Sequence, residues 1–245
     1  MIACCPRTAL FKAAILVGTL LGVARAGVAD GAWSATIATD TDYVFRGISQ
    51  TYGGAAVQGG VSYRHPSGWL AGAWASNVGP YPFGVGAVEV NLYTSFGWSL
   101  SPTWTARTAY THYVYAWDRR HAPYDYNEFA MTVAYEDLLA ATVSYQPDST
   151  LYSTFGYVRD RPSTAVEVSG SWPLPHGIAL SAGLGHYDLT RLYHLDYWSG
   201  SAGASYTLGR AQFNLTRFFS DRTARRLFED ATADGRWVAS AVWRF

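Results

Sequence analysis

Ten charged or amide side chains recur on one face of segments whose other face is apolar. They are candidate pore-lining residues: Asp40, Asp42, Arg46, Arg64, Glu89, Asn91, Arg107, Glu128, Glu167 and Arg244. Such side chains could line a water-filled path and set its selectivity, or they could pair across an interior and fill it. Because acids and bases nearly balance, strong ion selectivity is not expected. Gln50 and Gln58 are predicted beside them at the outer mouth.

The sequence offers no clear catalytic or metal-binding constellation. The histidines form no i,i+4 pair, have no cysteine partner and match no H-E-x-x-H pattern, so we expect no metal and no cofactor. An outer-membrane phospholipase would place a serine beside a histidine, and no His-x-Ser-Asn-Gly stretch is present. Asp40 and Asp42 could serve a protease resembling the omptins, but spacing alone shows no His–Asp pair. We therefore expect no enzyme.

The chain ends on a strand pattern of period two. Trp237, Ala239, Ala241, Trp243 and Phe245 alternate with Arg236, Val238, Ser240, Val242 and Arg244. An exposed apolar edge strand promotes aggregation, whereas the closing strand of an outer-membrane barrel alternates lipid-facing and lumen-facing residues. Trp237, Trp243 and Phe245 are accordingly predicted to form a C-terminal barrel-assembly signal.

The N-terminal residues predict a cleaved secretory signal at residues 1–26, followed by one barrel domain at residues 27–245. Arg7 and Lys12 precede an apolar run of about ten residues and an Ala-Arg-Ala site, with cleavage after Ala26 or, second, after Ala29. Without that segment, the chain has 15 basic and 18 acidic side chains. A mildly acidic protein is a poor nucleic-acid binder. Aromatic residues make up 16% of the chain, which suits strands and interfacial girdles.

Period-two alternation recurs along the remaining chain and predicts an all-β fold, a transmembrane antiparallel up-and-down β-barrel. The first strand is predicted over residues 33–49, with Tyr43 and Phe45 on its apolar face. Five tight turns are predicted at residues 65–68, 100–103, 136–137, 173–177 and 208–210. Longer, more polar links fall between them, at residues 47–55, 78–84, 116–125, 188–195 and 220–234.

Strand number follows from these connections. A simple count gives 13 strands, an odd number that single-chain bacterial barrels do not have. Short periplasmic turns alternate strictly with long outer loops only if residues 146–162 form one outer excursion, which gives 12 strands; 14 is the other even count considered. Arg217 shares the lipid-facing side of its strand with Leu215, so either it reaches the membrane interface or the register there differs.

One segment resembles a known family. Thr41-Asp42-Tyr43-Val44-Phe45-Arg46-Gly47-Ile48-Ser49-Gln50-Thr51 is similar to the opening motif of the TorF-type porin family, a conserved family of bacterial outer-membrane barrels. Further similar stretches are Ala56-Val57-Gln58-Gly59-Gly60, Gly68-Trp69-Leu70-Ala71-Gly72, Glu89-Val90-Asn91 and Pro173-Leu174-Pro175-His176-Gly177. The resemblance implies an outer-membrane, porin-like protein and names no solute. The residues of the first motif could form a polar entrance or simply shape the first hairpin, and we favour the latter.

We therefore expect a porin-like channel in the bacterial outer membrane for passive diffusion of small solutes. The expected partners are outer-membrane lipid and lipopolysaccharide, the barrel-assembly machinery with periplasmic chaperones, and the solutes themselves. The alternative is a structural or adhesive barrel with a closed interior and surface-binding outer loops. Interlocked bulky side chains such as Tyr93, Tyr113, Arg107 and Glu89 would favour that closure.

Overall fold

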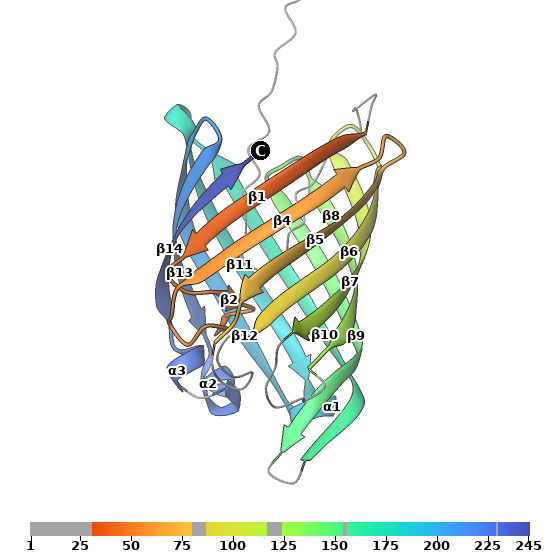
Figure 1. The fold of residues 1–245 in the computed structure, drawn as a ribbon, viewed down its shortest axis with the longest axis vertical. Helices are drawn as coiled ribbons and strands as arrows, with labels where there is room; N and C mark the ends of the chain where they lie inside the picture. The colour runs from red at the N-terminus through yellow and green to blue at the C-terminus, as the bar shows by residue number, and fades with distance from the viewer. Residues whose placement is uncertain (1–30, 80–86, 117–123, 154–155, 229) are drawn as a thin grey trace, which may run out of the picture.

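Alternating apolar and polar residues fold this chain into a closed antiparallel barrel (Figure 1). The computed structural model describes residues 31–79, 87–116, 124–153, 156–228 and 230–245. The predicted signal at residues 1–26 lies outside these residues, as do parts of the predicted links 78–84 and 116–125. In the described part, none of the helices is long and apolar enough to cross a membrane.

Within the described residues, twelve strands form the barrel wall, which confirms the predicted fold class and strand number. They are β1 (Ala32–Asp40), β4 (Ala56–Arg64), β5 (Trp69–Asn77), β6 (Val88–Ser99), β7 (Trp104–Ala116), β8 (Tyr126–Tyr135), β9 (Leu139–Ser153), β10 (Gly156–Pro173), β11 (Ile178–Leu189), β12 (Leu195–Leu208), β13 (Ala211–Ser220) and β14 (Arg236–Arg244). β1 closes the ring because it pairs with both β4 and β14. Closure leaves no free strand edge.

The short connections lie at one end of the barrel, as predicted, and the longer ones at the other. Short turns join β4 to β5, β6 to β7, β8 to β9, β10 to β11 and β12 to β13, with a 3-10 turn at Pro175–Gly177. The longer connections carry α1 (Thr190–Tyr193), α2 (Arg222–Phe228) and α3 (Asp230–Ala233). Because short turns of such barrels are periplasmic, we call the short-turn end periplasmic and the opposite end outer.

The outward face supplies the surface that a membrane requires. Exposed aliphatic side chains, among them Ile37, Leu92, Val143, Leu184 and Leu215, cover the middle of the wall. Exposed tryptophans cluster where strands meet the periplasmic turns, at Trp33, Trp69, Trp104, Trp172 and Trp243. An apolar band bordered by aromatic residues is the exterior of outer-membrane barrels.

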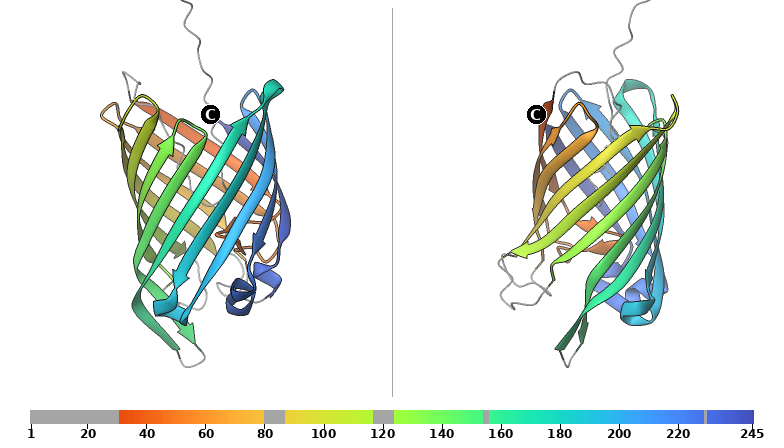
Figure 2. Two further views of the ribbon diagram at one scale, coloured as in Figure 1. Left: turned by 180° about the vertical axis from the view of Figure 1, so that it is seen from behind. Right: turned by 90° about the vertical axis from the view of Figure 1, so that its right-hand side faces the viewer.

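Residues 146–162 add no membrane strand, but they are not an irregular loop either. β9 and β10 continue through them as a paired ribbon, with Gln146 opposite Ser163 and Ser153 opposite Gly156. A register shift interrupts the ribbon near Arg161. The ribbon projects beyond the barrel at the outer end (Figure 2).

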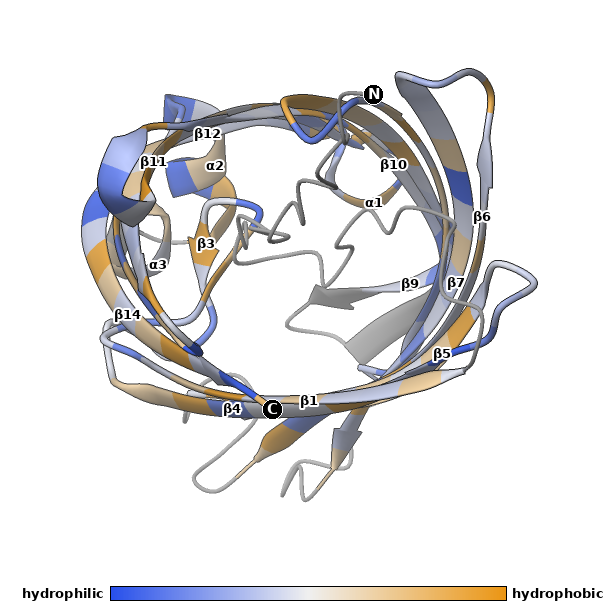
Figure 3. Cartoon of the chain, turned by 90° about the horizontal axis from the view of Figure 1, so that it is seen from above, coloured by the Kyte–Doolittle hydropathy of each residue, from blue (hydrophilic) through white to orange (hydrophobic). Residues whose placement is uncertain are grey.

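The predicted first strand is too long. β1 ends at Asp40, and residues 41–55 turn into the barrel instead of continuing its wall. This segment, which we call the internal hairpin, contains β2 (Val44–Phe45) paired with β3 (Ile48–Ser49). Viewed from above, β3 lies inside the ring of strands (Figure 3). Tyr43 and Phe45 therefore pack in the interior and do not face lipid.

Candidate functional site

The internal hairpin reverses on two residues, Arg46 and Gly47. Both have positive φ, 51° and 80°, as the type I′ hairpin turn requires. Glycine adopts this conformation readily, and the arginine is held there by its surroundings. The tight turn carries the Arg46 side chain to the far side of the barrel interior.

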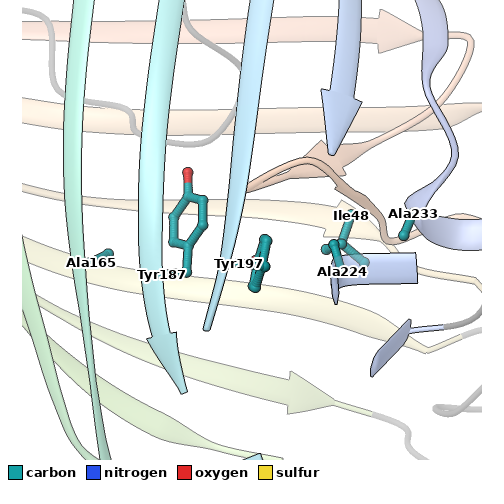
Figure 4. Packing of buried hydrophobic residues seen from close by; sticks show 6 residues of the cluster. All are labelled: Ile48, Ala165, Tyr187, Tyr197, Ala224 and Ala233. Atoms are coloured by element: carbon teal, nitrogen blue, oxygen red, sulfur yellow. The ribbon is translucent and has the colours of Figure 1, made fainter. Parts of the chain in front are cut away.

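Apolar residues of the hairpin are buried against the outer half of the wall. Val44 has an exposed fraction of 0% and packs against Phe218 and Val238. Ile48 lies in a buried cluster with Tyr187 and Tyr197 of the wall and with the alanines of α2 and α3, Ala224 and Ala233 (Figure 4). These contacts make the outer half of the interior resemble a packed core.

Asp42 ties the base of the hairpin together. Its carboxylate accepts hydrogen bonds from Ser49 Oγ at 2.6 Å and from Thr51 Oγ1 at 2.7 Å. Arg236 of β14 donates to the same carboxylate at 2.6 Å. Local hydroxyl groups thus set the loop conformation, and the arginine fastens it to the wall.

On the β5–β6 side, Tyr43 fixes the hairpin through its ring and its hydroxyl. The ring packs edge-on against Trp74, and the hydroxyl donates to Glu89 Oε1 at 3.2 Å. Asn91 donates to the same oxygen at 2.8 Å. Burial, and next the Glu89 charge, raise the pKa of the Tyr43 hydroxyl, so it remains a donor at physiological pH.

The tip of the hairpin is held by charge. The Arg46 guanidinium lies 2.7 Å from Glu128 Oε2 and 3.7 Å from Glu167 Oε2, and its side chain is only 9% exposed. It lies over the rings of Phe45 and Tyr187. Gln146 donates a further hydrogen bond to Glu128 at 2.6 Å. A buried pair of this kind needs such additional partners to offset desolvation.

Backbone contacts complete the attachment on the β12–β13 side. Tyr197 donates to the Arg46 carbonyl at 3.2 Å, and Ser220 donates to the Gly47 carbonyl at 3.0 Å. The hairpin therefore spans the interior, from Trp74 and Glu89 on one side to Glu128, Tyr197 and Ser220 on the other. It narrows the outer half of the barrel.

The periplasmic half has a different lining. Along β10 to β12 and at Ser62 of β4, the inward-facing residues are small and remain partly exposed: Ser62, Ser169, Ser171, Ser181, Ser201, Gly203 and Ser205. On β12 the change occurs within the strand, since Tyr197 and Ser199 are buried and Ser201 and Ser205 are not. These small residues form a strip of hydroxyl groups on one part of the wall, whereas larger side chains, among them Arg107 and Gln212, are buried on other strands of the same half.

A small cavity lies where the two halves meet. Its volume is about 60 Å³, and its lining includes Arg46, Thr142, Glu167, Ser169 and Ser201. The cavity borders both the hairpin tip, at Arg46 and Gly47, and the wall from β9 to β13. Two atoms of its lining residues, Arg46 Nε and Glu167 Oε2, have no hydrogen-bond partner among the described residues.

The structure gathers most of the predicted site residues around the hairpin and places three of the predicted arginines in the other half of the barrel. The acids Asp40, Asp42, Glu89, Glu128 and Glu167 lie around the hairpin with Arg46, Arg236 and Asn91. Arg64, Arg107 and Arg244 face the interior of the periplasmic half, where Arg244 donates to Gln212 at 2.9 Å. Whether any of these side chains lines a conducting path stays a prediction.

The two predicted mouth residues differ in position. Gln50 lies at the end of the internal hairpin and donates to the Ile48 carbonyl, whereas Gln58 is a buried residue of β4. Of the two interpretations of the motif, the hairpin-forming one describes residues 41–50, but the hairpin lies inside the barrel. Asp42 and Arg46 are accordingly residues of this loop and not of the first wall strand.

Sequence reasoning missed several residues that hold the hairpin: Tyr43, Ser49, Thr51, Gln146, Tyr187, Tyr197, Ser220 and Arg236. Most are separated from their partners by long stretches of chain. Arg236 and Asp42, for example, are 194 residues apart. One local signal was present. Arg46-Gly47 lies between alternating apolar residues, as the centre of a two-residue hairpin turn does, but such a turn requires that both residues accept positive φ.

Comparison with known proteins gives a family and a fold. Residues 25–242 match the model of the family Gcw_chp, described as a bacterial protein of unknown function, so the chain belongs to that family. No curated protein sequence matches the chain. The resemblance to TorF-type porins stated above is confirmed only in the coarser sense of a shared porin-like barrel.

Solved structures of similar fold are outer-membrane porins. The NanC porin is 9% identical with a TM-score of 0.56, covering 86% of this chain and 98% of its own. The KdgM porin is 8% identical with a TM-score of 0.54, covering 86% and 99%. A KdgM porin in complex with disordered oligogalacturonate has a TM-score of 0.53 at 9% identity, again covering 86% and 99%. The shared fold and the apolar, aromatic-bordered exterior place this chain in the bacterial outer membrane.

Proposed function

We propose that this member of the Gcw_chp family is a narrow outer-membrane channel for passive diffusion of small polar solutes. The observation that carries the proposal is the contrast inside the barrel. The internal hairpin narrows the outer half, whereas a strip of small, partly exposed polar side chains runs along β10 to β12 in the periplasmic half. A barrel serving only as a scaffold has no need of an inward-facing strip of exposed hydroxyl groups. Selectivity would follow from pore width and lining polarity.

One neighbour in fold supports a saccharide-like solute. The KdgM porin is described in complex with disordered oligogalacturonate, so a barrel of this fold can hold a sugar chain. The likeness concerns the fold, and it transfers no residue. No cofactor and no catalytic step enter this proposal.

The proposed partners follow from the exterior. Trp237, Trp243 and Phe245 are exposed on the outward side of the closing strand, where the barrel-assembly machinery and periplasmic chaperones could recognise them. The apolar wall would contact outer-membrane lipid, and the outer loops would contact lipopolysaccharide.

The alternative function is a closed barrel with structural or adhesive outer loops. It is favoured by the burial of the hairpin, because Val44, Tyr43 and Ile48 are packed as tightly as core residues. Tyr113 also stacks on Tyr126, with ring centroids 4.3 Å apart. This packing would hold the outer half shut if the hairpin never moves and if its margin admits no solute.

Single-channel conductance in planar bilayers distinguishes the two functions. The refolded protein is compared with a variant whose residues 43–50 are replaced by an eight-residue Gly/Ser linker, and with Arg107→Ala. We expect discrete steps for the wild type, larger steps for the linker variant, and an altered cation-to-anion ratio for Arg107→Ala. Heat-modifiable migration confirms that each variant is folded. A folded wild type without current would contradict the channel and support the closed barrel.

A further inference from the structure

We propose that the cavity between Arg46 and the wall is a binding subsite for an uncharged polyhydroxylated solute, such as a polyol or a sugar. This inference rests on the proposed channel function and names its solute class. The subsite would lie on one side of the internal hairpin, along β10, β11 and β12.

The polar atoms of the cavity define what it can bind. Arg46 Nε–H is a donor without a partner among the described residues, on a side chain that is more than nine-tenths buried. Glu167 Oε2 is an acceptor without a hydrogen-bond partner, although Oε1 of the same carboxylate accepts from Tyr187 at 2.9 Å. A hydroxyl group both donates and accepts. Both atoms are themselves enclosed by the protein, so the groups of the cavity that a solute meets are the hydroxyls of Thr142, Ser169 and Ser201, and their hydrogen-bond partners are hydroxyls as well.

Charge argues against an anionic solute. The Arg46 guanidinium already faces Glu128 and Glu167, so the site as a whole carries no excess positive charge. A carboxylate entering the cavity would approach two like charges at close range, in surroundings from which water is largely excluded. An uncharged solute avoids that repulsion.

The wall beyond the cavity continues the same chemistry. Ser169, Thr142 and Ser201 line the cavity, and Ser171, Ser181 and Ser205 follow on the inward face toward the periplasmic end. The glycines Gly183 and Gly203 keep this strip flat between the serines. A solute that leaves the cavity toward the periplasmic end would form hydrogen bonds with successive serine hydroxyl groups.

The volume of the cavity limits how much of a solute it can hold at one time. A volume of about 60 Å³ is several times the roughly 10–15 Å³ that a cavity needs to hold one water molecule. The cavity can therefore hold one hydroxymethyl group of a solute, while the remainder of the molecule extends into the periplasmic half. Small linear or single-ring solutes fit this description, and bulky ones do not.

Swelling of proteoliposomes in glucose and in gluconate tests the subsite, with the full-length protein in every case. Ser169→Leu removes a hydroxyl and fills the cavity. Ser62→Leu makes the same change on β4, which lies diametrically opposite β10 in the strand order and lines no part of the cavity. Ser201→Val is a smaller change at the cavity, for use if Ser169→Leu does not fold. Conductance of small ions is measured in parallel.

We expect wild-type vesicles to swell faster in glucose than in gluconate. Ser169→Leu should slow the glucose rate about fivefold, the equivalent of losing about one hydrogen bond of 1 kcal/mol, and Ser62→Leu should change it less than about twofold. Glu167→Gln should raise the gluconate rate relative to glucose, because it removes one of the two facing carboxylates.

Three results would overturn the proposal. Faster entry of gluconate than glucose would replace it with an anion subsite. Equal slowing by Ser169→Leu and Ser62→Leu would show that the cavity is not on the path. In both cases ion conductance persists and the channel function survives. A wild type that passes neither ions nor glucose would overturn the channel function together with the subsite.

Discussion

The outer and periplasmic halves of the barrel interior are lined by the same strands but are packed differently. In the outer half, the hairpin brings buried apolar side chains and an ion pair into contact with most of the wall. In the periplasmic half, small serines and glycines line β10 to β12, and arginines face the interior from other strands. The difference shows that the outer half of this barrel is filled by a segment folded into it and not by the side chains of its wall alone. Substitutions should therefore be costly near the hairpin and tolerated below it.

The largest expected effect is the loss of the arginine at the hairpin tip. Arg46→Ala leaves Glu128 buried without its counter-charge, and we expect the folded barrel to lose about 3–5 kcal/mol of stability. Arg64→Ala, a partly exposed arginine of the periplasmic half, should cost less than about 1 kcal/mol. Urea unfolding in phospholipid vesicles measures both. Equal losses for the two variants would contradict the division into two regions.

A second test compares two glycines that share a positive φ. At Gly47 an added Cβ would collide with the hydroxyl groups of Ser199 and Ser220, whereas at Gly209, in a periplasmic turn, it would meet nothing within 4 Å. We expect Gly47→Ala to cost about 2–4 kcal/mol, since overpacking is added to backbone strain. Gly209→Ala carries only the strain, about 1 kcal/mol. Unfolding midpoints under identical conditions report the difference.

A smaller effect is expected at the β5–β6 side of the hairpin. Tyr43→Phe keeps the ring against Trp74 and removes the hydrogen bond to Glu89, which still accepts from Asn91. The expected loss is about 0.5–1.5 kcal/mol, typical of one intramolecular hydrogen bond. The same variant should pass ions more readily if the hairpin loosens. Unchanged stability would show that the hydroxyl does not fasten the loop.

The smallest effect concerns the outward face. Arg217 lies opposite Trp237 on β14, with its guanidinium over the indole ring, and keeps the predicted register. Because an arginine near the membrane interface costs only about 0–1 kcal/mol, Arg217→Leu should leave stability unchanged or raise it by that amount. A loss above about 2 kcal/mol in the same unfolding assay would mean that Arg217 has an interior role.

Much of the architecture follows from local sequence pattern. Alternation fixes which face of each strand is apolar, and compact turn sequences mark the periplasmic connections. Both signals depend on residues close together in the sequence, so they can be recognised without knowing which strands are neighbours. The outward position of Trp237 and Trp243 and the inward position of Arg107 and Arg244 are of this kind.

By itself, then, the sequence determined a closed antiparallel barrel, its short turns and its two faces, and it favoured twelve strands over fourteen. Only the tertiary structure decided that residues 41–55 leave the wall and cross the interior. Their alternating pattern is the same for a wall strand as for an inward hairpin, and the groups that decide between them are distant along the chain. Arg46 meets Glu128 82 residues away, and Gly47 meets Ser220 173 residues away. Such contacts exist only once the barrel has closed around the hairpin.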